Sequence, residues 1–163
     1  MRYGKLNFTD IANGTGVRVS LFVSGCRRRC KGCFNSDAWS FNYGEWYTVE
    51  TYDKIIRALA PEYIAGLSIL GGEPLEPENK HNIIDLCAWV KIHYPDKTIW
   101  LYTGYKYEDL KDDYILDVID VLVDGEFIEA EKDISLKFRG SRNQRIIDVH
   151  ASRLAGEVVL LEV

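Results

Sequence analysis

Short apolar runs alternate with amphipathic segments along the chain. Four of the runs are rich in β-branched and aromatic residues and are predicted to be strands: 17–23, 66–70, 98–102 and 118–124. Apolar side chains recur at helical spacing in two longer segments and more weakly in a third, acidic one, which predicts helices at 49–60, 78–93 and 107–117. Thr48 is a suitable N-cap for the first helix, and Pro95 ends the second. Further strands are expected at 145–149 and 157–163.

This order of elements predicts an α/β fold with a mostly parallel sheet, because strand–helix–strand units place their strands in parallel. Nearly all strand residues are apolar, as expected when both faces of a sheet are covered. The four main strands are followed by polar or glycine-containing residues, at Cys26, 71–73, 103–104 and 124–125. Ligands of such sheets bind beyond the carboxyl ends of the strands, so we expect these four segments to meet on one rim.

Composition and charge exclude several classes of protein. The chain has 163 residues, 47% hydrophobic and 28% charged, which is typical of a single globular domain over 1–163. Its net charge of −5 argues against direct binding of nucleic acid. The first ten residues lack the apolar core of a secretory signal, and no run approaches the ~20 apolar residues of a membrane span. We therefore expect a cytoplasmic protein with no membrane partner, in a compartment where clustered cysteines more often bind metal than form disulfides.

Cys26, Cys30 and Cys33 have the spacing C-x3-C-x2-C directly after the first predicted strand. Thiolates on so short a loop can bind one side of a compact zinc or iron–sulfur centre. A [4Fe–4S] cluster normally takes four cysteines, so three would leave one iron open to a small molecule. A structural zinc site would need a fourth ligand, but Cys87 lies among apolar helix positions and is expected to be a core residue. A non-catalytic iron–sulfur or zinc module stays open as an alternative.

The cysteine spacing, followed by GGEPL at 71–75 after the next strand, resembles the radical S-adenosylmethionine superfamily. Members of that superfamily usually carry an aromatic residue just before the third cysteine. Here Gly32 takes that place and the aromatic residue, Phe34, follows the cysteine. This variant is similar to the activating enzymes of anaerobic ribonucleoside-triphosphate reductase. Five more segments share the similarity: NGTGVR at 13–18, LFVSGC at 21–26, LYTGY at 101–105, VDGEF at 123–127 and FRGSRNQRIIDV at 138–149.

The resemblance implies a [4Fe–4S] cluster with three cysteine ligands, whose free iron binds S-adenosylmethionine. It further implies reductive cleavage of that cofactor to a 5′-deoxyadenosyl radical, which makes a glycyl radical on the partner, the anaerobic ribonucleoside-triphosphate reductase. The short chain would form a compact partial (βα) barrel, open on one side to a loop of the partner. Activation of another glycyl-radical enzyme, such as pyruvate formate-lyase, is the nearest alternative.

The resemblance also implies roles for particular residues. Gly71, Gly72 and Glu73 would hold the amino group of S-adenosylmethionine through backbone and carboxylate oxygens. Weaker candidates for cofactor contacts are Phe34, Tyr102, Thr103 and Asp124. The segment 138–145 is either a solvated loop or a loop that meets a ligand or partner, and its candidate residues are Arg139, Asn143, Gln144 and Arg145.

Charge is distributed unevenly along the chain. Four cations, Arg27, Arg28, Arg29 and Lys31, surround the second cysteine, whereas 106–133 is strongly acidic. Such runs usually form solvated faces. Beside a redox cluster, cations can also steer an acidic electron donor, so we hypothesise that the basic loop docks a flavodoxin-like reductant.

Overall fold

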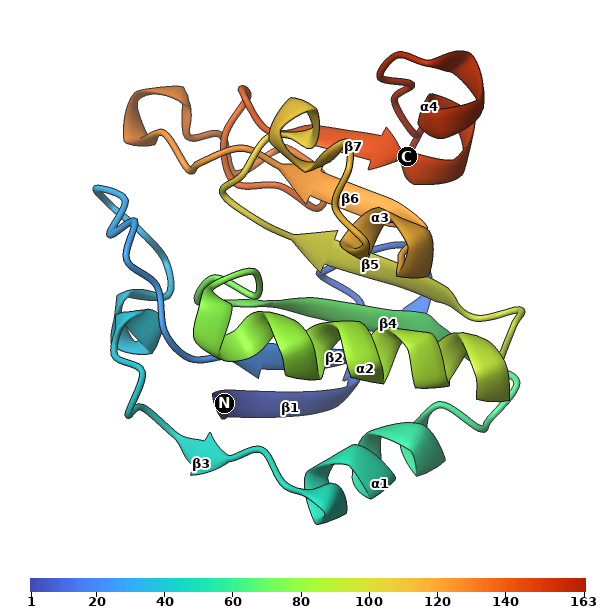
Figure 1. The fold of residues 1–163 in the computed structure, drawn as a ribbon. Coiled ribbons are helices and arrows are strands. Elements are labelled where there is room, and N and C mark those ends of the chain that lie inside the picture. The colour runs from blue at the N-terminus through green and yellow to red at the C-terminus, as the bar shows by residue number, and fades with distance from the viewer.

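The computed structural model describes residues 1–163 and contains one seven-stranded mixed sheet (Figure 1). Its strands are β1 (Arg2–Asp10), β2 (Val17–Val23), β3 (Glu45–Trp46), β4 (Ile64–Gly71), β5 (Thr98–Tyr102), β6 (Val121–Asp124) and β7 (Arg145–Asp148). They lie in the order β3-β1-β2-β4-β5-β6-β7. The central strands β2, β4, β5 and β6 are parallel, whereas β1, β3 and β7 pair antiparallel at the two ends. The predicted α/β fold with a mostly parallel sheet is therefore confirmed.

Four helices accompany the sheet: α1 (Val49–Ala58), α2 (Pro77–His93), α3 (Ile115–Val118) and α4 (Val149–Ala155). The first three lie on one face of the sheet, and α4 follows β7 near the C-terminus (Figure 1). Thr48 caps α1 as expected, because its side chain accepts a hydrogen bond from the Thr51 N–H. None of the helices is long and apolar enough to cross a membrane.

Alternate residues of the strands pack into two apolar clusters, one on each face of the sheet. The larger cluster joins the sheet to the helices and includes Ile99 and Leu101 of β5, both fully buried. Trp100, between them, belongs to a smaller cluster that Phe138 covers, with the two ring centroids 5.5 Å apart. This alternation follows from the two-residue period of a strand. It places the loop after β6 over the second face of the sheet.

Several local expectations from the sequence were wrong. The segment 107–117 is a 3-10 turn at Tyr107–Leu110 followed by the one-turn helix α3, because the Asp113 carboxylate caps the Ile115 N–H at 3.0 Å. The segment 157–163 forms only a single bridge, between Ile147 and Leu160. The expected strand at 145–149 ends at Asp148, whose side chain accepts from the Ala151 N–H and so starts α4.

Arg18 is a fully buried arginine that joins three strands of the sheet. It donates to the Ser68 hydroxyl at 2.8 Å, the Leu67 carbonyl at 3.0 Å and the Thr98 carbonyl at 2.7 Å. Burial lowers the pKa of Arg18 to about 10, so the guanidinium stays charged at neutral pH. This network fixes the amino end of the parallel sheet, away from the cysteines.

We expect Arg18→Met to lower the free energy of unfolding by about 2–4 kcal/mol, because buried hydroxyl and carbonyl acceptors lose their donor. Urea unfolding followed by circular dichroism measures the change. Arg57→Met, on the exposed side of α1, is the control and should change stability little. Equal stability of the two variants would contradict this role for Arg18.

Candidate metal centre

The cysteine loop and the ends of the four parallel strands surround one cavity of about 450 Å³. Its wall contains the three clustered cysteines and most of the strand-end residues: Cys26, Cys30, Cys33, Gly71, Gly72, Glu73, Tyr102, Thr103, Gly104 and Gly125. The expectation that these segments meet on one rim is confirmed. It holds because parallel strands place all their carboxyl ends at the same edge of the sheet.

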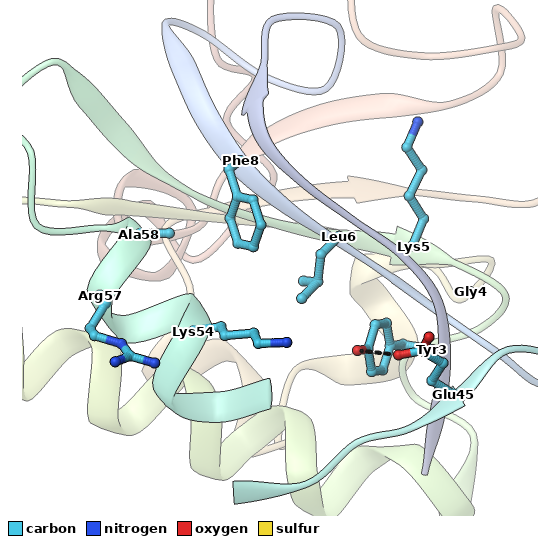
Figure 2. A pocket seen from close by; sticks show the side chains of 9 residues that line it. All are labelled: Tyr3, Gly4, Lys5, Leu6, Phe8, Glu45, Lys54, Arg57 and Ala58. Atoms are coloured by element: carbon cyan, nitrogen blue, oxygen red, sulfur yellow. Dashed lines mark hydrogen bonds between the residues drawn. The ribbon is translucent and has the colours of Figure 1, made fainter. Parts of the chain in front are cut away.

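A second hollow, of about 540 Å³, lies between β1 and α1 (Figure 2). Figure 2 shows Lys54 and Arg57 on α1 and the apolar side chains Leu6 and Phe8 on β1. No cysteine or histidine lines this hollow. It offers no ligand set for a metal, so the cysteine cavity is the candidate site.

Main-chain hydrogen bonds hold the start of the cysteine loop. The Gly25 N–H donates to the Ala38 carbonyl at 2.7 Å, and the Cys26 N–H donates to the Trp39 carbonyl at 3.1 Å. The loop turns at Gly32, which has φ +75°, a conformation that side chains other than glycine resist. A Cβ at this position would also lie 2.9 Å from Cδ of Glu129, so a larger residue here would have to displace that half-exposed side chain.

The three thiols of the loop are partly buried and free of disulfides. No three His, Cys, Asp or Glu side chains of the chain converge on a point where one ion could bind. Burial raises the pKa of Cys26 and Cys30 above the usual value of a thiol.

Cys87 does not take part in this site. It lies on α2, is fully buried and belongs to the apolar cluster between the helices and the sheet. The prediction that it is a core residue is confirmed. A structural zinc site with Cys87 as its fourth ligand is therefore ruled out.

Gly71 and Gly72 let the turn after β4 pack against the backbone that leads into the cysteine loop. Gly71 has φ +109°, and a Cβ there would lie 2.6 Å from the Val23 backbone. A Cβ on Gly72 would lie 2.6 Å from the carbonyl oxygen of Gly25. The glycines are thus needed for contact between two parts of the chain itself, whatever else they bind.

The carboxylate of Glu73 is almost fully buried and already has several donors. It accepts from the Thr103 hydroxyl at 2.7 Å, the Gly104 N–H at 2.8 Å and the Leu75 N–H at 3.0 Å. Burial raises the pKa of Glu73, while these donors and the nearby Arg28 guanidinium act in the opposite direction. Glu73 therefore joins the end of β4 to the end of β5.

A family profile described as "4Fe-4S single cluster domain" matches residues 12–147. Among similar curated proteins, one from Vibrio cholerae is 47% identical over 150 residues, which are 90% of this chain and 97% of the relative. One from Enterobacteria phage T4 is 43% identical over 148 residues, 90% of this chain and 93% of the relative. One from Escherichia coli K12 is 43% identical over 148 residues, which are 88% of this chain and 96% of the relative. All three are named anaerobic ribonucleoside-triphosphate reductase-activating protein.

The chain belongs to this family of activating proteins. The resemblance inferred from the cysteine spacing and the GGEPL segment is thereby confirmed. The profile match over 12–147 includes every segment that borders the cysteine cavity.

The other site residues predicted for this activating protein lie in two cavities. Phe34, Arg139 and Gln144 line the cysteine cavity. Asn143, Arg145 and Asp124 instead line a neighbouring polar cavity of about 840 Å³. The two cavities share a wall made of Arg28, Gly104, Gly125 and Glu126.

Asp124 is bonded within the chain. Its carboxylate accepts from the Tyr107 N–H at 2.8 Å and pairs with Arg145, which also binds Glu108. Arg145 lowers the pKa of Glu108 to about 2. Asp124 thus connects β6 to β7 and to the turn at Tyr107–Leu110, rather than pointing at the cysteines.

Sequence reasoning missed several residues of the cysteine cavity, including Asn13, Trp39 and Phe127. The sequence also suggested that all the cations of the basic loop lie on a solvated face. Arg27 is paired with Glu76 and Glu78, and Arg28 is partly buried between Glu73 and Glu126. These partners lie far away in the sequence, so no local pattern identifies them.

We expect Asp124→Asn to lower the free energy of unfolding by about 1.5–3 kcal/mol, because Arg145 loses a charged partner that is almost fully buried. Iron content after reconstitution should stay unchanged, since Asp124 does not line the cysteine cavity. Asp112→Asn, at an exposed position, is the control. Loss of cofactor binding at unchanged stability would mean instead that Asp124 contacts the cofactor.

Proposed function

We propose that this protein is the enzyme that activates anaerobic ribonucleoside-triphosphate reductase, using a [4Fe–4S] cluster and S-adenosylmethionine to create a glycyl radical. One observation carries the proposal: three cysteines on one loop and the GGE turn after β4 enclose the same cavity. It is supported by membership in a family whose named relatives activate that reductase. Such an enzyme would work in the cytoplasm, as one domain over 1–163.

Within the cavity, Cys26, Cys30 and Cys33 would hold the cluster and leave one iron for the cofactor. The backbone oxygens of Gly71 and Gly72 would receive the cofactor's amino group, because the Glu73 carboxylate already has its own donors. The Tyr102 hydroxyl is buried beside the cavity and has no partner within the chain, which suits a contact to ribose or methionine.

When bound, the cluster would pass one electron from the reductant to S-adenosylmethionine, whose C–S bond would break to give methionine and a 5′-deoxyadenosyl radical able to take a hydrogen atom from a glycine Cα. This chain then needs no general base. Its residues must place the cofactor close to that glycine and exclude water. The apolar rings of Phe22, Phe34 and Phe127 around the cavity would help to exclude water. The open sheet, with β3 and β7 at its edges, would correspond to a partial barrel that admits a loop of the reductase.

Anaerobic reconstitution with iron and sulfide tests this proposal. We expect about four irons per chain and 5′-deoxyadenosine formation after addition of dithionite and S-adenosylmethionine. Cys26→Ala, Cys30→Ala and Cys33→Ala should each abolish cleavage. Cys87→Ala should retain the cluster and lose only packing stability, because it lies in the apolar core.

Mixing the reduced protein with glycyl-radical enzymes identifies the partner by electron paramagnetic resonance. The expected result is a glycyl radical on the reductase. A signal on pyruvate formate-lyase alone would overturn the assignment of the partner. Colourless protein without 5′-deoxyadenosine would favour a zinc module and overturn the enzymatic proposal.

We propose further that a flavodoxin-like donor docks on Arg29 and Lys31. Arg27 and Arg28 are each paired with two carboxylates of the chain, whereas Lys31 has a single exposed partner, Glu129, at 3.7 Å, and such exposed pairs are weak. Lys31 is 93% exposed, and Arg29 is exposed beside Trp39. Replacing both with glutamine should slow turnover with flavodoxin about fivefold at low salt and flatten its salt dependence, while dithionite-driven turnover stays unchanged. An unchanged rate with flavodoxin would refute this docking face.

A further inference from the structure

Arg28 lies between the first two clustered cysteines, yet its side chain turns inward. It is 21% exposed, whereas its neighbours Arg27 and Arg29 are on the surface. Nothing in its local sequence distinguishes it from those neighbours. The guanidinium lies among the three loops that follow β4, β5 and β6.

One contact joins Arg28 to each of these loops. Its Nε lies 3.5 Å from the Glu73 carboxylate, after β4. Its guanidinium carbon lies 4.2 Å from the centre of the Tyr105 ring, after β5. Its Nη1 donates to the Glu126 carboxylate at 2.6 Å, after β6. The planar fork of arginine can reach two carboxylates and an aromatic face at once, which a lysine cannot do.

Gly104 leaves the space that Arg28 fills. A Cβ at Gly104 would lie 2.4 Å from both Cδ and Nε of Arg28. The backbone of Gly104 is not in the left-handed region, and the three atoms nearest to such a Cβ all belong to Arg28. The Gly104 N–H meanwhile donates to Glu73, so the same turn positions both members of the ion pair.

We infer that Arg28 is a positioning residue: it fixes the cysteine loop against the ends of β4, β5 and β6 and so sets where the cluster meets S-adenosylmethionine. The nearly buried Glu73 needs a nearby positive charge, and Arg28 provides it from the cysteine loop itself. Only the last step of this inference, the position of the cluster relative to S-adenosylmethionine, rests on the proposed function. The fixing of the loop can be measured without any cofactor.

Hydrogen–deuterium exchange of the full-length apoprotein tests the fixing of the loop. Arg28→Gln removes the charge, Arg28→Lys keeps the charge without the fork, and Gly104→Ala displaces the side chain without changing the charge. We expect exchange in 26–33 to be at least tenfold faster in Arg28→Gln and Gly104→Ala, and intermediate in Arg28→Lys. Combining Arg28→Gln with Gly104→Ala should add little, because both remove the same interaction.

Two comparisons separate local from general effects. Arg29→Gln makes the same change of charge on the same loop at an exposed position, and it should leave exchange unchanged. Amides of α2 in the same samples should also keep their rates. Unchanged exchange in 26–33 of Arg28→Gln, or equal acceleration in α2, would overturn the inference.

Reconstituted protein tests the consequence for the cofactor. We expect Arg28→Gln and Gly104→Ala to keep their iron but to bind S-adenosylmethionine at least tenfold more weakly, with a smaller cofactor-induced change in the electron paramagnetic resonance spectrum of the reduced cluster. If these variants match the wild type in both readouts, Arg28 does not position the cofactor. If the wild type itself binds no cluster, the proposed function fails, while the exchange result still stands.

Discussion

Close packing of two stretches of main chain underlies the site. The Glu73 N–H donates to the Gly25 carbonyl at 2.8 Å, and the Gly72 N–H donates to the Val23 carbonyl at 2.8 Å. Only glycine at position 72 permits this approach, since a Cβ would overlap the Gly25 oxygen. The cysteine loop and the GGE turn are thus held together by backbone, whose geometry varies far less than that of long side chains.

Charge pairs extend this backbone contact to the rest of the rim. Glu73 and Asp124 lie at the ends of different parallel strands, and each buried carboxylate has an arginine partner: Arg28 of the cysteine loop for Glu73 and Arg145 of β7 for Asp124. The basic loop also meets the acidic segment directly, through Arg28 with Glu126 and Lys31 with Glu129. The two opposite charge runs of the sequence therefore meet across the site at these two pairs, while Arg29 has no carboxylate partner.

The sequence predicts those parts of the fold that are buried on a regular period. The strands β2, β4 and β5 each place alternate apolar residues in the larger cluster, and these patterns identified them. The sequence did not predict strand β1. Its outer edge pairs with β3 only at Arg2 and Tyr3, so most of its residues are polar or exposed and show no apolar strand pattern. The apolar tail at 157–163 looked like a strand, but tertiary contacts allow it only one bridge.

Within the site, motif positions were predictable and side-chain directions were not. Cysteines and glycines at strand ends must meet on the rim of a parallel sheet, so their convergence follows from topology. Arg28 and Glu126 are 98 residues apart, and nothing local links them. Asp124 likewise pairs with Arg145 of the adjacent strand, a choice that only the register of β6 and β7 reveals.

Gly32 and Phe34 show how one exchange in a motif reorganises its surroundings. Gly32 has φ +75°, a backbone conformation that an aromatic residue rarely adopts, and Glu129 occupies the space beside it. The aromatic ring follows that cysteine instead, and Phe34 packs on Phe127 with ring centroids 5.1 Å apart. Arg28 on one side of the cysteines and Phe34 on the other therefore bind the same loop, which follows β6. The position of that loop, as much as the sheet, determines the shape of the cavity.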